Sequence, residues 1–187
     1  PCITGDNYTA IYRLTRALID LGHQQVALFV PGLWSGKSLE IVIDAHTRAL
    51  REAGLQFIPE AVEFSRKLDH HSLKSMKEFL QHFPDVTAIL TTYLDVAIKM
   101  AEYADLVDWD IPGRLSLASL QTGRWGTPPM NIFGAQYDWD KIIRKAMELI
   151  IDEKFKINEN GFSRLVMEPK LNHSQPSSIA PPPQPSK

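Results

Sequence analysis

Apolar residues first recur at helical spacing near the start of the chain. Between Asn7 and Leu21 they fall on one stripe, at Ile11, Leu14, Leu18 and Leu21. This period predicts an amphipathic helix, and Asp6 stands just before it as a candidate N-cap. Gly22 follows as a helix stop, because glycine readily adopts the left-handed backbone conformation that ends helices.

A different pattern follows, a continuous apolar run from Gln25 to Val30 that Pro31 and Gly32 end. Such a run is typical of a strand covered on both faces. Helical and strand patterns then alternate. The expected helices are 37–53, 72–82, 95–106 and 138–154, and the expected strands are 61–64, 86–91, 115–120 and 164–167. This alternation predicts the α/β class, with a mainly parallel sheet sandwiched by helices.

Ligands of such sheets bind at the carboxyl ends of the strands. Here those ends are followed by residues 31–38, 91–95 and 121–125. Two tryptophans, Trp34 and Trp125, fall in these loops, where an aromatic face could stack on a sugar ring or a heterocycle. The alternative is a structural role, with each indole capping the edge of the sheet.

Composition limits the function classes. The chain has 187 residues, 44% of them apolar, which suits one domain with a substantial core. A net charge of −2 gives no basic field for nucleic acid, and no apolar run is long enough to span a membrane. The one cysteine, Cys2, excludes an internal disulfide. The chain begins at proline rather than methionine, so upstream domains are expected.

Residues 174–187 are rich in proline and serine and contain one large apolar residue. A segment of this kind buries too little surface to offset its ordering entropy. We therefore expect an ordered domain over 1–171 and a disordered tail over 172–187. A proline-rich ligand for an aromatic groove is the alternative for this tail.

One stretch approaches a nucleotide-binding motif. Gly36-Lys37-Ser38 matches the end of a P-loop, but Pro31 occupies the position of its first glycine. Proline also removes a backbone donor that a phosphate would need. A degenerate nucleotide-binding loop is therefore the weaker interpretation.

No other motif indicates catalysis or a metal. His70 and His71 are adjacent, so on a helix their side chains point apart. Nothing resembles a nucleophile elbow. We expect no enzyme activity, no cofactor and no metal site.

Several short motifs occur in an order and spacing that resembles one known family. They are Asp6-Asn7-Tyr8, Gly22-His23, Thr87-Ala88-Ile89-Leu90, the run from Asp110 to Leu117, Pro128-Pro129, and the helix through Ala146 to Ile150. Together, from Asp6 to about Pro169, they resemble the effector-binding domain of the lactose-repressor/galactose-repressor family of bacterial transcription regulators. That domain has a periplasmic-binding-protein-like fold.

The resemblance implies two similar lobes joined by three crossovers, with a small-molecule effector between them. This chain would hold the carboxyl-terminal lobe and one crossover helix, which begins at Asp138. The implied function is ligand sensing and homodimerisation in a cytoplasmic regulator. DNA would be bound only through a helix-turn-helix domain upstream. A solute-binding receptor of a sugar transporter, which shares the lobes, is the alternative.

The expected ligand-binding residues are Trp34, Ser38, Tyr93, Gln121, Trp125 and Trp139. Ser38 and the aromatic residue at Trp139 match the family pattern, but its arginine is replaced by Val42. Its Asn-Asp pair is Tyr93-Leu94 here, and its Phe-Asp pair is Leu120-Gln121. Without the arginine and the aspartate, either the effector is sugar-like or aromatic and held mainly by aromatic contacts, or effector control is lost.

Overall fold

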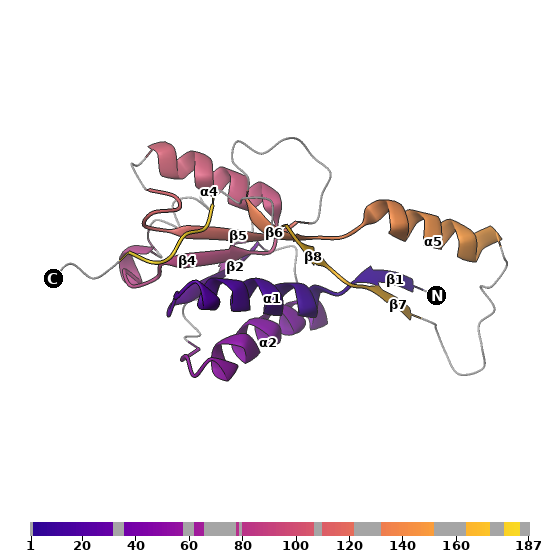
Figure 1. Ribbon diagram of the computed structural model, residues 1–187, viewed down its shortest axis with the longest axis horizontal. Coiled ribbons are helices and arrows are strands. Elements are labelled where there is room, and N and C mark those ends of the chain that lie inside the picture. The colour runs from indigo at the N-terminus through magenta and orange to yellow at the C-terminus, as the bar shows by residue number, and fades with distance from the viewer. Residues whose placement is uncertain are drawn as a thin grey trace.

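In the computed structural model, the described residues are 2–31, 36–57, 62–65, 78, 80–106, 110–121, 132–151, 164–172 and 178–183. Most of them form one sheet flanked by helices, while α5 and a small two-stranded sheet extend from one end (Figure 1). The helices are α1 (Asn7–Asp20), α2 (Lys37–Glu52), α4 (Leu94–Leu106) and α5 (Trp139–Ile151). The strands are β1 (Cys2–Gly5), β2 (Val26–Pro31), β3 (Val62–Ser65), β4 (Ala88–Thr91), β5 (Ser116–Gln121), β6 (Phe133–Gln136), β7 (Arg164–Met167) and β8 (Lys170–Leu171).

The main sheet has the order β3-β2-β4-β5-β6-β8, and every pair in it is parallel except β6 with β8. β1 and β7 pair in parallel as a separate ribbon. The predicted α/β class is therefore confirmed. Three strands were not expected from the sequence. β1 and β6 have only four residues each, and β8 has two, so none shows a clear period.

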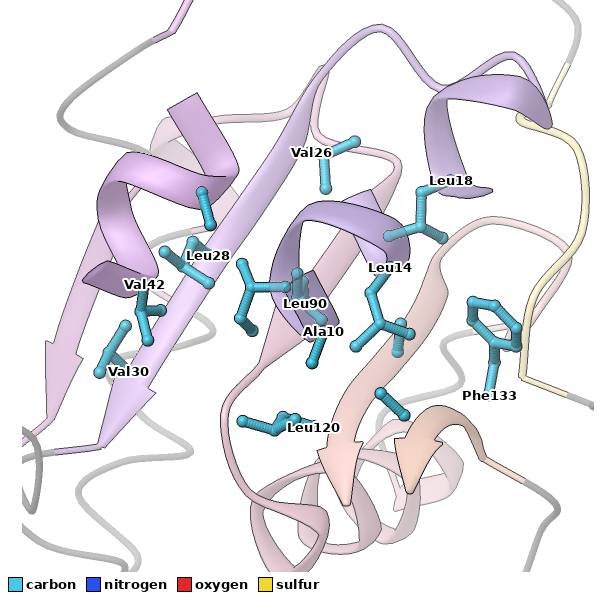
Figure 2. Packing of buried hydrophobic residues seen from close by; sticks show 14 of the residues in the cluster. Ala10, Leu14, Leu18, Val26, Leu28, Val30, Val42, Leu90, Leu120 and Phe133 are labelled. Atoms are coloured by element: carbon cyan, nitrogen blue, oxygen red, sulfur yellow. The ribbon is translucent and has the colours of Figure 1, made fainter. Parts of the chain in front are cut away.

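Both faces of the main sheet are covered, which explains the unbroken apolar run in β2. Leu28 and Val30 pack under α1 and α2, whereas Ala27 and Phe29 pack under α4. Successive side chains of a strand point to opposite faces, so both sets must be apolar here. Figure 2 shows Leu14 and Leu18 of α1 over the first of these two layers.

The predicted helix ends are confirmed for α1. Asp6 accepts hydrogen bonds from Thr9 through both carboxylate oxygens, at 2.9 Å from the backbone N and 2.7 Å from Oγ1. At the other end, Gly22 has a φ of 104°, which few other residues tolerate. The helix expected over 72–82 lies mostly outside the described residues. Within that range only residues 78 and 80–82 are described, and they are helical.

The carboxyl-terminal segment differs from the disordered tail expected over 172–187. Residues 178–183 are described, and Ser178 is fully buried against the sheet. For residues 178–183 composition alone misleads, because this segment is held by hydrogen bonds to distant strands. Residues 173–177 and 184–187 lie outside the described part of the chain.

Candidate ligand site at the carboxyl ends of the strands

The parallel strands of the main sheet end along one edge. The pairing places Thr91 of β4 beside both Phe29 of β2 and Ser119 of β5, and Gln121 of β5 beside Gln136 of β6. The loops that follow these strands therefore start from neighbouring positions, as in other open α/β sheets that bind ligands at this edge.

Three segments of the chain pass this edge toward α5 and the β1–β7 ribbon. The backbone N of Asp6, after β1, donates to the carbonyl of Met167, at the end of β7, at 2.9 Å. The hydroxyl of Tyr137, after β6, donates to Oδ1 of Asn7 at 2.8 Å. The three crossing segments, 5–7, 136–139 and 167–169, are thus tied to one another by hydrogen bonds. The Asp6-Asn7 motif therefore caps α1 and also joins its own crossing segment to the other two.

Tyr137 is held closely between these segments. It is 7% exposed, and a Cβ added to Gly5 would lie 2.5 Å from the Cζ atom of its ring. Only a residue without a side chain fits under this ring. Burial, and to a smaller extent the carboxylate of Asp6, raises the pKa of the Tyr137 hydroxyl. The hydroxyl therefore remains protonated and able to donate to Asn7.

An exposed aromatic side chain stands next to this buried one. Trp139, the first residue of α5, is 39% exposed and packs edge-on against Tyr137, with ring centroids 6.4 Å apart and planes at 75°. Asp138 caps the same helix end, because its Oδ1 accepts from the backbone N of Lys141 at 2.9 Å. The indole is thus oriented by a fixed ring and a capped helix while part of its surface is open to a ligand.

The other expected site residues are placed to different extents. Ser38 is exposed in the first turn of α2, and Tyr93 is half-buried between β4 and α4. Gln121 is the last residue of β5, and its side chain lies outside what is described. Ser38, Tyr93, Gln121 and Trp139 each lie at or after the end of a different strand. Trp34 and Trp125 lie outside the described residues.

Two residues at this edge were not singled out from the sequence. Tyr137 precedes the expected helix and has no motif of its own. Thr92, directly after β4, is fully buried, and its hydroxyl has no hydrogen-bond partner among the described residues.

Val42, which stands where the family pattern has an arginine, lies on α2 and is fully buried in the layer between the sheet and helices α1 and α2. Its side chain therefore packs in the hydrophobic core.

The described residues contain no group of three or more His, Cys, Asp or Glu side chains that could hold a metal ion. None of the helices described is long and apolar enough to cross a membrane.

No protein-family model matches the chain. Among curated proteins, the HTH-type transcriptional regulator AglR of Rhizobium meliloti (strain 1021) is 33% identical over 101 residues, which are 52% of this chain and 27% of that protein. The chain thus spans about a quarter of the length of this relative.

Solved structures match over nearly the whole chain. A transcription regulator from Lactobacillus plantarum has a TM-score of 0.79 at 18% identity, with 97% of this chain and 69% of that chain covered. A LacI family transcriptional regulator from Enterococcus faecium, solved with bound ribose, has a TM-score of 0.75 at 14% identity, with 96% and 65% covered. The chain therefore has the fold of LacI-family transcription regulators, of which it spans about two thirds.

Proposed function

We propose that this chain is the ligand-sensing and dimerisation part of a bacterial transcription regulator. A small-molecule effector binds at the carboxyl ends of the strands, between this lobe and a second lobe. The observation that carries the proposal is the joining of three crossing segments by the Asp6–Met167 and Asn7–Tyr137 hydrogen bonds. Crossings tied in this way move together, as a hinge between two lobes must.

The exposed face of α5 supports a second lobe. Ile143, Met147 and Ile150 are each at least half exposed, and on β7 Leu165 and Val166 are 37% and 44% exposed. The three α5 side chains recur at i, i+4 and i+7 and so lie on one face of the helix, and monomeric proteins seldom leave apolar faces of this kind open to water. In the proposal this surface packs on the second lobe, which is in keeping with the part of the solved regulators that this chain does not cover.

The contact between the rings of Tyr137 and Trp139 suggests the class of effector. Trp139 presents a partly exposed ring at the crossing, and rings of this kind stack on sugar rings and heterocycles. The ribose bound to the Enterococcus faecium regulator makes a sugar-like ligand a reasonable first probe. Ser38 contributes a hydrogen bond, and Trp34, Tyr93, Gln121 and Trp125 complete the site in the proposal. Neither the family's arginine nor its aspartate is present, so strongly anionic or densely hydroxylated ligands should bind poorly.

The test is a tryptophan fluorescence titration of the full-length protein with a panel of sugars, nucleosides and aromatic metabolites. A buried aromatic contact contributes on the order of 1 kcal/mol beyond its area burial, so Trp139→Ala should raise the Kd of a bound ligand several-fold or more. Trp139→Phe keeps a ring and should lose less. Binding that is unchanged in Trp34→Ala and in Trp139→Ala would exclude the proposed site.

The proposal also places the protein in the cytoplasm, as a homodimer that binds DNA through an upstream domain. A solute-binding receptor of a sugar transporter would instead carry a secretory signal. The upstream sequence distinguishes the two, because a helix-turn-helix segment is required by the first and absent from the second.

A further inference from the structure

The carboxyl-terminal residues Ser178–Pro183 run along the amino ends of β5 and β6, at the opposite edge of the sheet from the crossings (Figure 1). They follow β8 in the chain, where Asn172 is already fixed to β6. Its backbone N donates to Gly134 O at 2.9 Å, and its side-chain Oδ1 accepts from Gly134 N at 2.7 Å. Residues 173–177, between Asn172 and this segment, lie outside the described part of the chain.

Ser178 bridges the two strands at their starts. Its Oγ accepts from the backbone N of Phe133 at 2.8 Å and donates to the carbonyl of Leu117 at 2.7 Å. Its own carbonyl accepts from the backbone N of Leu117 at 2.6 Å. One serine thus satisfies three main-chain groups of two buried residues. Each would otherwise be buried without a hydrogen-bond partner, which is unfavourable.

A second set of contacts holds Ala180. Its backbone N donates to Ser116 Oγ at 2.9 Å, and its carbonyl lies 2.9 Å from both Ser116 Oγ and His23 Nε2. On the other side of the imidazole, Nδ1 lies 2.8 Å from Thr87 Oγ1. Pro182 lies close to Gly22, the glycine that ends α1. The segment is therefore joined to β5, to β6 and to the end of α1.

This geometry fixes the tautomer of His23. A carbonyl oxygen can only accept, so the contact with Ala180 requires a proton on Nε2. In the neutral ring Nδ1 then accepts from the Thr87 hydroxyl. Burial lowers the pKa of His23, and the Ala180 carbonyl opposes this change only in part. The groups that face the ring, from the loop before β4, from β5 and from the tail, are Thr87, Ser116 and Ala180, and none of them titrates.

We propose that Ser178–Pro183 is a docked strap that closes the amino end of the sheet and opens as one unit before the lobe unfolds. Ser178 and His23 are the two residues that hold it. Ser178 completes the ladder between β5 and β6, and His23 positions the strap through the Ala180 carbonyl. β8 and Asn172 fasten the third crossing to β6 independently of the strap.

Hydrogen exchange measured by NMR on the whole chain tests this proposal. The backbone N–H groups of Leu117, Phe133 and Ala180 should share one opening equilibrium, and they should exchange faster than the N–H of Leu90 in β4. Ser178→Ala removes the hydroxyl that accepts from the Phe133 N–H and donates to the Leu117 carbonyl, so of the three amides only that of Phe133 directly loses its acceptor. If the strap opens as a unit, exchange at Leu117 and Ala180 should also accelerate, on the order of tenfold or more.

Ser119→Ala is a matched control on the same strand. Ser119 is also fully buried, but its hydroxyl donates only to the carbonyl of Leu120, at 3.3 Å. This variant should leave the three amides protected. The proposal is overturned if Ser178→Ala accelerates exchange at Phe133 alone, or if Ala180 exchanges in the unaltered chain at the rate of an unstructured peptide.

Two substitutions of His23 separate positioning from packing and apply even if Ser178→Ala does not fold. The amide nitrogen of glutamine can take the place of Nε2 and donate to Ala180, whereas that of asparagine reaches only the place of Nδ1. Protection of the Ala180 amide should therefore survive in His23→Gln and fall about tenfold in His23→Asn. In the unaltered chain, nitrogen-15 shifts of His23 should report the Nε2–H tautomer. Equal protection in the two variants, or an Nδ1–H tautomer, would contradict the assigned role.

Discussion

Single residues at the crossings show what sequence patterns can and cannot identify. The Asp6-Asn7 pair is recognisable because a capping residue before an apolar stripe has a local signature. Its link to Tyr137 is not recognisable, because 130 residues separate Asn7 from its partner. Trp139 was expected at the site because it matches an aromatic residue of the family pattern. Thr92 could not be expected there, because its burial is evident only in the folded chain.

The contact between Gly5 and Tyr137 gives a prediction at this scale. Gly5→Ala places a methyl group 2.5 Å from the ring of a buried tyrosine, so the ring or the β1 crossing must shift. Overpacking of this kind costs about 1–3 kcal/mol, which urea unfolding should measure as a lower midpoint. In a Tyr137→Leu background the same change should cost much less. An equal cost in both backgrounds would show that the two residues are not coupled.

Secondary-structure elements were predicted best where the pattern is long and local. The expected ranges of the four helices fall within a few residues of α1, α2, α4 and α5. The short strands β6 and β8 were missed, as was the strap, because each depends on partners far away in the chain. Composition alone predicted disorder where Ser178 supplies a buried bridge.

Helix α5 gives a prediction at the scale of an element. Ile142 is 9% exposed and packs with the core, whereas Ile143, Met147 and Ile150 are exposed. This chain alone should therefore self-associate at high micromolar concentration, as measured by light scattering. Replacing Ile143 and Met147 with lysine should reduce the association. Glu148→Lys, on the same helix, controls for added positive charge. A monomer at these concentrations would contradict the prediction.

Two histidines, His23 and His46, are buried in the folded molecule. His46 of α2 lies against Thr15 of α1, with Nδ1 3.0 Å from Oγ1, and burial lowers its pKa from 6.5 to about 4. His23 is shifted in the same direction. Both rings are neutral in the folded protein near pH 7, while in the unfolded chain each binds a proton more readily.

Stability should therefore depend on acidity. Well above pH 6.5 both histidines are neutral in the folded and in the unfolded chain, and the free energy of unfolding is at its full value. As the pH falls from 6.5 toward 4, the unfolded chain binds more protons than the folded one, so the free energy of unfolding decreases. His46 alone accounts for about 3 kcal/mol of this loss. The measurement is urea unfolding between pH 7.5 and 4.5. His46→Gln should be less stable at pH 7.5 and show a smaller dependence on pH. An unchanged dependence would contradict the assignment.

At the scale of the whole molecule, the alternation of strands and helices predicted a mainly parallel sheet, and therefore that the carboxyl ends of its strands lie together along one edge. It did not identify how the crossings are joined. Asn7, Tyr137 and Met167 come from three distant segments, and only the folded chain brings them together.

Hydrogen exchange of the full-length protein, with and without a ligand found in the fluorescence panel, tests the central claim most directly. If the effector lies between two lobes, binding should slow exchange at the amides of Tyr93, of residues 137–139, and of Met167 and Glu168. The amides of Leu117 and Phe133, at the opposite edge of the sheet, should change little. A ligand that binds and protects neither the crossings nor Tyr93 would contradict the proposed sensing site.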